Sequence, residues 1–155
     1  MCVTFCIRGC VEKKMEVFAC KITDLEGDRK RLKIDNHDVI ILRHKGIFYA
    51  LDSFCYHAGG PLYKGDIEDI GSHSCIVCPW HRYKVTLQTG ENFYQSIDPY
   101  NTKKAPVWTC GGVKQRTHQV IIKDEDFYLK LSPCSGDLDS DHYNSPEYKY
   151  KNDLT

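Results

Sequence analysis

The sequence predicts an all-β fold of antiparallel strands. Short runs rich in β-branched and aromatic residues alternate with turns that contain glycine or aspartate, as in sheets whose strands follow one another closely. The clearest pair of runs is a hairpin in which residues 39–44 and 47–51 flank the turn Lys45-Gly46. Glycine supplies the positive φ that such a tight turn needs. A second hairpin is expected near the other end of the chain, where residues 119–122 and 127–131 flank the polar residues 123–126.

The remaining strands follow from the same signals. Residues 74–77 form a short apolar run, and residues 66–70 before it combine acidic side chains with isoleucine. Residues 91–104 are polar and turn-rich, so we expect a loop there. Besides the first hairpin, the expected strands are residues 16–22, 31–34, 66–70, 74–77, 83–87, 119–122 and 127–131.

Length and charge narrow the class of protein. The 155 residues suffice for one domain with a hydrophobic core. The 21 basic and 21 acidic side chains give a net charge of zero. This balance gives no indication of a nucleic-acid or membrane-surface partner. Residues 1–10 are interrupted by Arg8 and followed by lysines, so they predict neither a secretory signal nor a membrane span. We expect a cytoplasmic monomer, with a mitochondrial location as the alternative.

The chain is expected to divide into three parts. The domain occupies residues 16–131, and residues 1–15 precede it as an N-terminal extension. After Pro133 the composition shifts to Ser, Asp, Asn, Lys and Tyr, so residues 132–155 are expected to form a mobile polar tail. The alternative is that this tail docks on the sheet or on a partner through Tyr143, Tyr148 and Tyr150.

The nine cysteines are an odd number, in a chain expected to remain in a reducing compartment, so a disulfide framework is not expected. Cys20, Cys75 and Cys110 are expected as core or strand residues. Three further cysteines, spaced four residues apart, are expected as free thiols at a frayed terminus, with acylation as the alternative. They are Cys2, Cys6 and Cys10.

Four residues form two short metal-ligand motifs, each just beyond a predicted strand. Cys55 and His57 are separated by one residue, and Cys78 and His81 by two. A thiolate is a soft, charged donor that suits ferric iron and bridging sulfide, whereas a neutral imidazole leaves its iron easier to reduce. This mixed set predicts a [2Fe-2S] cluster whose two irons differ chemically.

The two motifs and their surroundings resemble the Rieske iron-sulfur fingerprint. Gly-Gly-Pro-Leu at residues 59–62 follows the first motif, and Ile-Val precedes the second. The resemblance is to small stand-alone Rieske proteins of the ferredoxin type and implies an antiparallel β-sandwich with a small cluster-binding subdomain. It also implies that Cys55 and Cys78 bind an inner iron, while His57 and His81 bind an outer iron and face solvent.

The departures from the Rieske pattern are informative. Residues 58–77 make the spacer between the motifs longer than usual, and Arg82 stands where most members have glycine, which implies strain if that position needs a positive φ. Respiratory members join two extra cysteines in a disulfide, but Gly60 and Trp80 occupy those positions here. The resemblance therefore implies the low end of the Rieske potential range, roughly −150 mV.

These features predict an electron-transfer protein, not an enzyme in its own right. The outer iron would exchange one electron with a reductase and an acceptor, while Tyr56, Trp80 and Pro61 keep the cluster dry. Arg82 would favour the reduced cluster and contact an acidic partner. The alternative function is a redox or iron-status sensor, in which cluster occupancy switches a partner.

The alternative use of the same four ligands is a zinc site, although classical zinc fingers space their ligands differently. Acidic residues 66–69 lack a nucleophile beside a base and are expected to be a solvated strand edge. The resemblance implies that Pro106 lies in a third loop that covers the cluster. The other histidines are expected at surfaces or turns: His37, His44, His73, His118 and His142.

Overall fold

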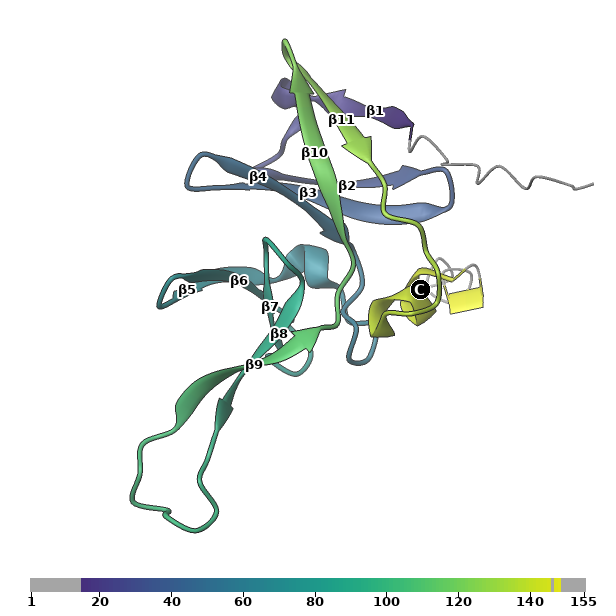
Figure 1. The fold of residues 1–155 in the computed structure, drawn as a ribbon. Coiled ribbons are helices and arrows are strands. Elements are labelled where there is room, and N and C mark those ends of the chain that lie inside the picture. The colour runs from purple at the N-terminus through teal and green to yellow at the C-terminus, as the bar shows by residue number, and fades with distance from the viewer. Residues whose placement is uncertain (1–14, 146, 149–155) are drawn as a thin grey trace, which may run out of the picture.

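The computed structural model describes residues 15–145, 147 and 148, and its regular structure is almost entirely strand (Figure 1), which confirms the all-β prediction. The strands are β1 (Glu16–Lys21), β2 (Arg29–Ile34), β3 (His37–His44), β4 (Ile47–Asp52), β5 (Asp66–Ile70), β6 (His73–Val77), β7 (Lys84–Thr86), β8 (Glu91–Ser96), β9 (Val107–Val113), β10 (Thr117–Lys123) and β11 (Asp126–Lys130). Three short 3-10 helices accompany them, namely η1 (Ile22–Asp24), η2 (Leu62–Lys64) and η3 (Asp139–Asn144).

The strands form two antiparallel sheets. The larger has six strands in the order β1-β11-β10-β4-β3-β2, and the smaller has five in the order β5-β6-β7-β8-β9. The second ligand motif lies in the loop between β6 and β7 of the smaller sheet. This sheet corresponds to the small cluster-binding subdomain that we expected. Residues Lys45 and Gly46, with φ of 50° and 75°, form the tight turn between β3 and β4. Both central turn residues therefore have the positive φ typical of a two-residue hairpin.

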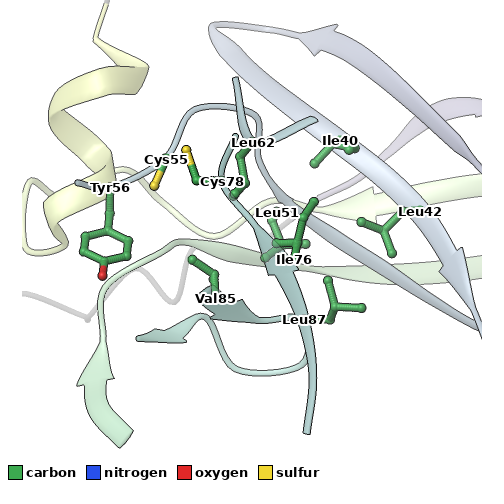
Figure 2. Close-up of a cluster of buried hydrophobic side chains, with 10 residues drawn as sticks. All are labelled: Ile40, Leu42, Leu51, Cys55, Tyr56, Leu62, Ile76, Cys78, Val85 and Leu87. Atoms are coloured by element: carbon green, nitrogen blue, oxygen red, sulfur yellow. The ribbon is translucent and has the colours of Figure 1, made fainter. Parts of the chain in front are cut away.

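Strand β3 connects the two halves of the hydrophobic core, because its side chains alternate between opposite faces of the sheet. Val39 and Ile41 pack with Phe127 in one cluster of buried side chains. Ile40 and Leu42 pack in a second cluster, which also contains the sulfur atoms of the predicted ligand cysteines (Figure 2). The candidate metal centre is thus an extension of the core between the sheets.

The prediction of a loop over residues 91–104 was wrong for its first part, since Glu91–Ser96 forms β8. This strand pairs with β9, which was also not predicted. Phe93 is the one fully buried side chain of β8, and most of β9 is exposed. A hairpin that extends away from the body (Figure 1) buries few of its side chains, so its sequence lacks the alternation that marks a strand.

The described part of the C-terminal segment is structured and contacts the body of the protein. Helix η3 buries Ser140, Asp141 and Asn144, and Tyr148 forms a hydrogen bond to the first ligand loop. The proposed domain limits remain predictions. The predicted roles of Cys2, Cys6, Cys10 and Tyr150 lie outside the described residues.

The described cysteines outside the motifs largely match expectation. Cys20 and Cys75 are buried free thiols in β1 and β6, whereas Cys110 is an exposed free thiol in β9. Within residues 15–145 and 147–148, no helix has both the length and the apolar character needed to cross a bilayer.

Candidate metal centre

The two ligand motifs lie in loops that are closed by matching backbone hydrogen bonds. In the first loop, Gly59 N–H donates to the Cys55 carbonyl oxygen at 2.8 Å, and in the second, Arg82 N–H donates to the Cys78 carbonyl oxygen at 3.0 Å. Gly59 and Arg82 both adopt positive φ, 70° and 61° respectively. Arg82 therefore holds the left-handed conformation that glycine adopts in the other loop, which confirms that this position needs the positive φ from which strain was expected.

The two cysteines lie side by side in the interior. Cys55 and Cys78 are both buried (Figure 2). A hydrogen bond between their side chains raises the pKa of Cys55 and lowers the pKa of Cys78 to about 6. Cluster binding would require both thiols to be deprotonated, because both ligands must be thiolates.

Backbone N–H groups surround each sulfur atom. The amides of His57 and Ala58 hydrogen-bond to the Cys55 sulfur and lower the pKa of that thiol. The amides of Trp80 and His81 act in the same way on Cys78. Such groups stabilise negative charge on sulfur, which is one of the ways in which proteins tune iron-sulfur centres.

The two histidines lie on the solvent side of the cysteines. His57 and His81 are exposed, and their ring centroids lie 5.0 Å apart with the planes at 89°. The phenol ring of Tyr83 stacks on His57 at 3.8 Å between centroids. The imidazoles are therefore close enough to share one metal ion, and a neighbouring aromatic ring holds one of them in place.

The spacing of the four donors fits a two-metal group better than a single zinc ion. Among the described residues, the one set of three or more donor atoms that lie within 4.8 Å of one another does not include any of these four side chains. A mononuclear tetrahedral site would bring its ligands closer than that, with metal bonds of about 2.0–2.3 Å. The cysteines and histidines instead form two separate pairs, as a two-iron cluster requires.

The residues predicted to keep the site dry differ in burial. Tyr56 is buried and Pro61 is half-buried, but the Trp80 side chain is 54% exposed. Gly60 matters through its size, because a Cβ atom there would lie 2.8 Å from the Cys78 sulfur and 3.0 Å from Trp80. The two positions at which respiratory Rieske proteins carry cysteines are therefore close together here, but they hold a glycine and an indole.

Arg82 does not present an unbalanced positive charge. Its guanidinium lies 3.0 Å from Glu68, which also binds Lys84 at 2.7 Å. The hydrogen bond from Lys84, followed by the charges of Lys84 and Arg82, lowers the pKa of Glu68. The neighbouring Asp69 accepts hydrogen bonds from Ser74 and pairs with basic side chains. The acidic run is thus an ion-paired strand edge.

Pro106 does not cover the ligand loops. It is exposed in the segment that joins β8 to β9 and extends away from the body (Figure 1). The segment that contacts the first ligand loop follows β9, where buried Gln115 accepts a hydrogen bond from Tyr56 N–H at 2.9 Å. Its amide also donates to the carbonyl oxygens of Asp52 and Phe54, at 3.0 and 2.8 Å. Nothing in the local sequence distinguishes this glutamine.

The expectation that His118 lies at a surface or turn was wrong. Its buried Nε2 lies 2.8 Å from Asp52 Oδ1, and His37 completes a compact cluster. Ser132 N–H donates to His118 Nδ1 at 3.0 Å, so that nitrogen carries the lone pair and the ring proton lies on Nε2. Both ring nitrogens of His118 are thus used in hydrogen bonds to Asp52 and Ser132, so the contacts that the structure shows here are those of a structural network.

This fold and its paired sulfur and nitrogen donors define a domain of the Rieske iron-sulfur class. The model of the soluble Rieske-type ferredoxin family matches residues 20–134, and the chain belongs to that family. Its members are electron-transfer proteins that carry an iron-sulfur cluster.

Known relatives agree with this assignment. The chain is 44% identical to a human Rieske domain-containing protein over 80% of this chain and 79% of the relative. It is 24% identical to the ferredoxin subunit of the 3-phenylpropionate/cinnamic acid dioxygenase of Photorhabdus laumondii, over 76% of this chain and 95% of that subunit. The ferredoxin of carbazole 1,9a-dioxygenase from Nocardioides aromaticivorans shares the fold, with a TM-score of 0.55 and 19% identity over 76% of this chain and 99% of that one.

Proposed function

We propose that this protein is a one-electron carrier that holds a single [2Fe-2S] cluster through Cys55, His57, Cys78 and His81. The observation that carries the proposal is the opposite exposure of the two donor pairs, with both cysteines buried and both histidines at the surface. An electron would enter and leave through the exposed imidazoles, because these give the shortest route between the outer iron and a partner.

The side chains and amides of the chain have separate tasks in this function. The cluster, when bound, supplies the one-electron redox couple. The amides of His57, Ala58, Trp80 and His81 favour the reduced form because they stabilise negative charge on sulfur. The buried side chains of the second core cluster exclude water from the inner side (Figure 2). The protein thereby limits reorganisation of solvent around the centre.

The proposed partners are a reductase and an electron acceptor. The relative from Photorhabdus laumondii is the ferredoxin subunit of a dioxygenase, which supports an oxygenase component as the class of acceptor. A groove beside the exposed His81 supports docking near the outer iron, and it is lined by Tyr83, Lys84 and Trp108. We propose the cytoplasm as the location, with mitochondria as the alternative.

The proposal is tested by iron and sulfide analysis together with electron paramagnetic resonance of the dithionite-reduced protein. We expect two irons and two sulfides per chain, a reduced-state signal, and repeated turnover with NAD(P)H and a flavoprotein ferredoxin reductase. Cys55→Ser should abolish the signal, whereas Cys110→Ser, which alters an exposed cysteine in β9, should retain it. Colourless protein with bound zinc would disprove the proposal.

The second candidate function is an iron-status sensor, and one observation favours it. The C-terminal segment contacts the first ligand loop directly, because Tyr143 and Tyr148 donate hydrogen bonds to its carbonyl oxygens. Loss of the cluster could therefore change the position of this segment and its availability to a partner. Slow reduction by the reductase, combined with partner binding that depends on cluster content, would support the sensor over the carrier.

A further inference from the structure

The C-terminal segment crosses the tip of the first ligand loop. The Tyr143 hydroxyl donates to the His57 carbonyl oxygen at 3.1 Å, and the Tyr148 hydroxyl donates to the Gly59 carbonyl oxygen at 3.0 Å. The two phenol rings meet edge to face, with centroids 5.0 Å apart. Two peptide groups of the ligand loop, 57–58 and 59–60, are therefore held by side chains from more than eighty positions away in the sequence.

The seating of this segment on the loop is close. A Cβ atom on Gly59 would lie 2.2 Å from the Tyr148 hydroxyl oxygen and 2.5 Å from Tyr143 Cδ1. Any other residue would push the tyrosines away, because real Cβ contacts are never this short. Glycine is thus required at position 59 for two reasons. It adopts the positive φ of the ligand loop, and it leaves room for the two tyrosines.

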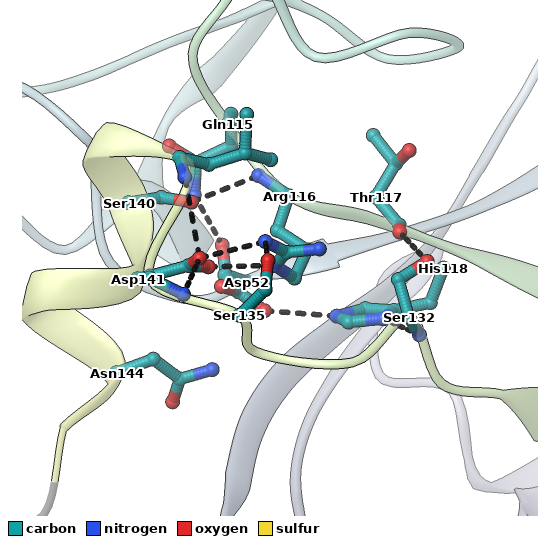
Figure 3. Close-up of polar contacts among 12 residues, drawn as sticks. Asp52, Gln115, Arg116, Thr117, His118, Ser132, Ser135, Ser140, Asp141 and Asn144 are labelled. Atoms are coloured by element: carbon teal, nitrogen blue, oxygen red, sulfur yellow. Dashed lines mark hydrogen bonds and ion pairs between the residues drawn. The ribbon is translucent and has the colours of Figure 1, made fainter.

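A buried ion pair anchors the segment to the body (Figure 3). Arg116 donates through Nε and a terminal nitrogen to the two oxygens of Asp141, at 2.6 Å each, and the two side chains are 9% and 3% exposed. The Arg116 backbone N–H also donates to Ser140 Oγ at 2.9 Å. Asn144 accepts a hydrogen bond from Asp38 N–H at 3.1 Å. Two-point pairing of this kind gives a defined geometry.

The same network reaches the base of the ligand loop. Arg116 follows Gln115, whose side chain binds backbone groups of Asp52, Phe54 and Tyr56. Residues 115–116 therefore hold the start of the loop directly and its tip indirectly, through the C-terminal segment. Gln115 therefore holds the start of the loop, and the C-terminal segment that Arg116 anchors holds its tip.

The contact of Tyr143 has a specific chemical consequence for the candidate centre. The peptide group between His57 and Ala58 accepts the Tyr143 hydroxyl at its carbonyl oxygen, and the N–H of the same peptide group lowers the pKa of the Cys55 thiol. Hydrogen bonds that are linked through one peptide group polarise one another. The Tyr143 hydroxyl therefore strengthens the interaction of the Ala58 N–H with the Cys55 sulfur and also orients the peptide group.

We propose that residues 138–145, 147 and 148 form a strap in which Tyr143 and Tyr148 are positioning residues for the cluster, holding the first ligand loop so that the Ala58 N–H faces the Cys55 sulfur. The strap slows loss of the cluster and raises its reduction potential. The inference rests on the proposed cluster ligation. It goes beyond the family assignment, because the matching family model ends at residue 134.

The experiment removes the two hydroxyl groups and leaves both rings in place. Tyr143→Phe, Tyr148→Phe and the double variant are compared with wild type and with Tyr100→Phe, whose tyrosine is 98% exposed in the β8–β9 segment. The readouts are the rate of visible bleaching with an iron chelator, the midpoint potential, and hydrogen exchange at the Ala58 amide. Far-ultraviolet circular dichroism shows whether each variant is folded.

We expect the double variant to lose its cluster about tenfold faster, to have a lower potential, and to exchange the Ala58 amide faster. Values equal to those of Tyr100→Phe in all three measurements would overturn the strap while leaving the cluster proposal intact. If wild type carries no cluster, the proposed function fails, and hydrogen exchange over residues 56–60 still decides whether the tyrosines hold the loop. An unfolded double variant would be replaced in this comparison by the two single variants.

Discussion

The imidazole of His57 lies against the phenol ring of Tyr83, with centroids 3.8 Å apart and planes inclined by only 15°. His57 belongs to the first ligand loop and Tyr83 follows the second, so the stack joins the two loops. His57 is also nearly perpendicular to His81, with ring centroids 5.0 Å apart, so its imidazole lies between Tyr83 stacked on its face and the other histidine. An aromatic ring therefore holds the exposed histidine His57, whereas backbone amides act on the two buried cysteines.

Removal of that stack should loosen the first histidine. We expect Tyr83→Leu to lose iron to a chelator about tenfold faster than wild type, the scale on which residues around a metal ligand act. Tyr83→Phe keeps the ring and should behave as wild type. The measurement is the decay of visible absorbance. Equal decay in Tyr83→Leu and wild type would show that the stack does not hold the ligand.

Replacement of a histidine ligand by cysteine should lower the potential. His81→Cys exchanges a neutral donor for a negative one, which disfavours the reduced cluster, so the midpoint should move toward the value of about −400 mV known for all-cysteine ferredoxins. His73→Cys, an exposed histidine of β6, is the matched control. A potentiometric titration decides the matter, and an unchanged midpoint would exclude His81 from the centre.

The positive φ of Arg82, 61°, should be measurable as strain. Arg82→Gly and Arg82→Ala both remove the ion pair with Glu68, but only glycine adopts this conformation freely. The glycine variant should therefore be more stable than the alanine variant, by about 1 kcal/mol in the free energy of unfolding. Urea denaturation measures the difference, and an equal or reversed order would show that the loop carries no strain there.

Two glycines with similar backbone conformation should respond differently to alanine. Gly59 and Gly71 have φ of 70° and 59°, so each substitution should cost about 1 kcal/mol. Space around Gly71 is open, whereas Gly59 touches Tyr148. Gly59→Ala should therefore cost a further 1–3 kcal/mol, roughly the penalty of overpacking. Adding Tyr148→Ala should recover part of that loss in urea denaturation, and no recovery would place the clash elsewhere.

The Arg116–Asp141 pair should give the protein an acid-sensitive stability. Burial alone would raise the pKa of Asp141, but hydrogen bonds from Arg116 and from the amides of Leu138 and Gly136 outweigh it, so the pKa is lowered. The contribution is then complete above the unfolded-state pKa of about 3.9 and declines as the pH falls through the lower folded-state pKa.

Asp141→Asn tests this contribution. At neutral pH the variant should be roughly 3 kcal/mol less stable than wild type, because a buried charge loses its partner. The difference in free energy of unfolding should shrink below about pH 4. Asp137→Asn, an exposed position in the same segment, should keep wild-type stability at neutral pH. A difference that does not vary with pH would argue against an ionic pair.

Strands that bury one or both faces were predictable, and those that bury neither were not. The apolar residues of 39–44 and 47–51 predicted β3 and β4, because these side chains must be buried in the core. Strands β8 and β9 form mostly from polar or exposed residues, and β8 pairs with both β7 and β9, so these strands depend on their neighbours in the sheet more than on an alternating pattern of their own. Pro106 was assigned to a covering loop through the family resemblance, whereas the structure places Gln115, which follows β9, against the first ligand loop.

The sequence by itself determined the all-β class, the Rieske-type family and the four candidate ligands, because strand periodicity and ligand spacing are local properties of the chain. Only the tertiary structure decided what surrounds those ligands. Gln115, Tyr143 and Tyr148 reach the first ligand loop from 59, 86 and 89 residues away. Contacts between residues so far apart produce no periodic pattern in the sequence. They form only after both sheets and the C-terminal segment have folded around one core.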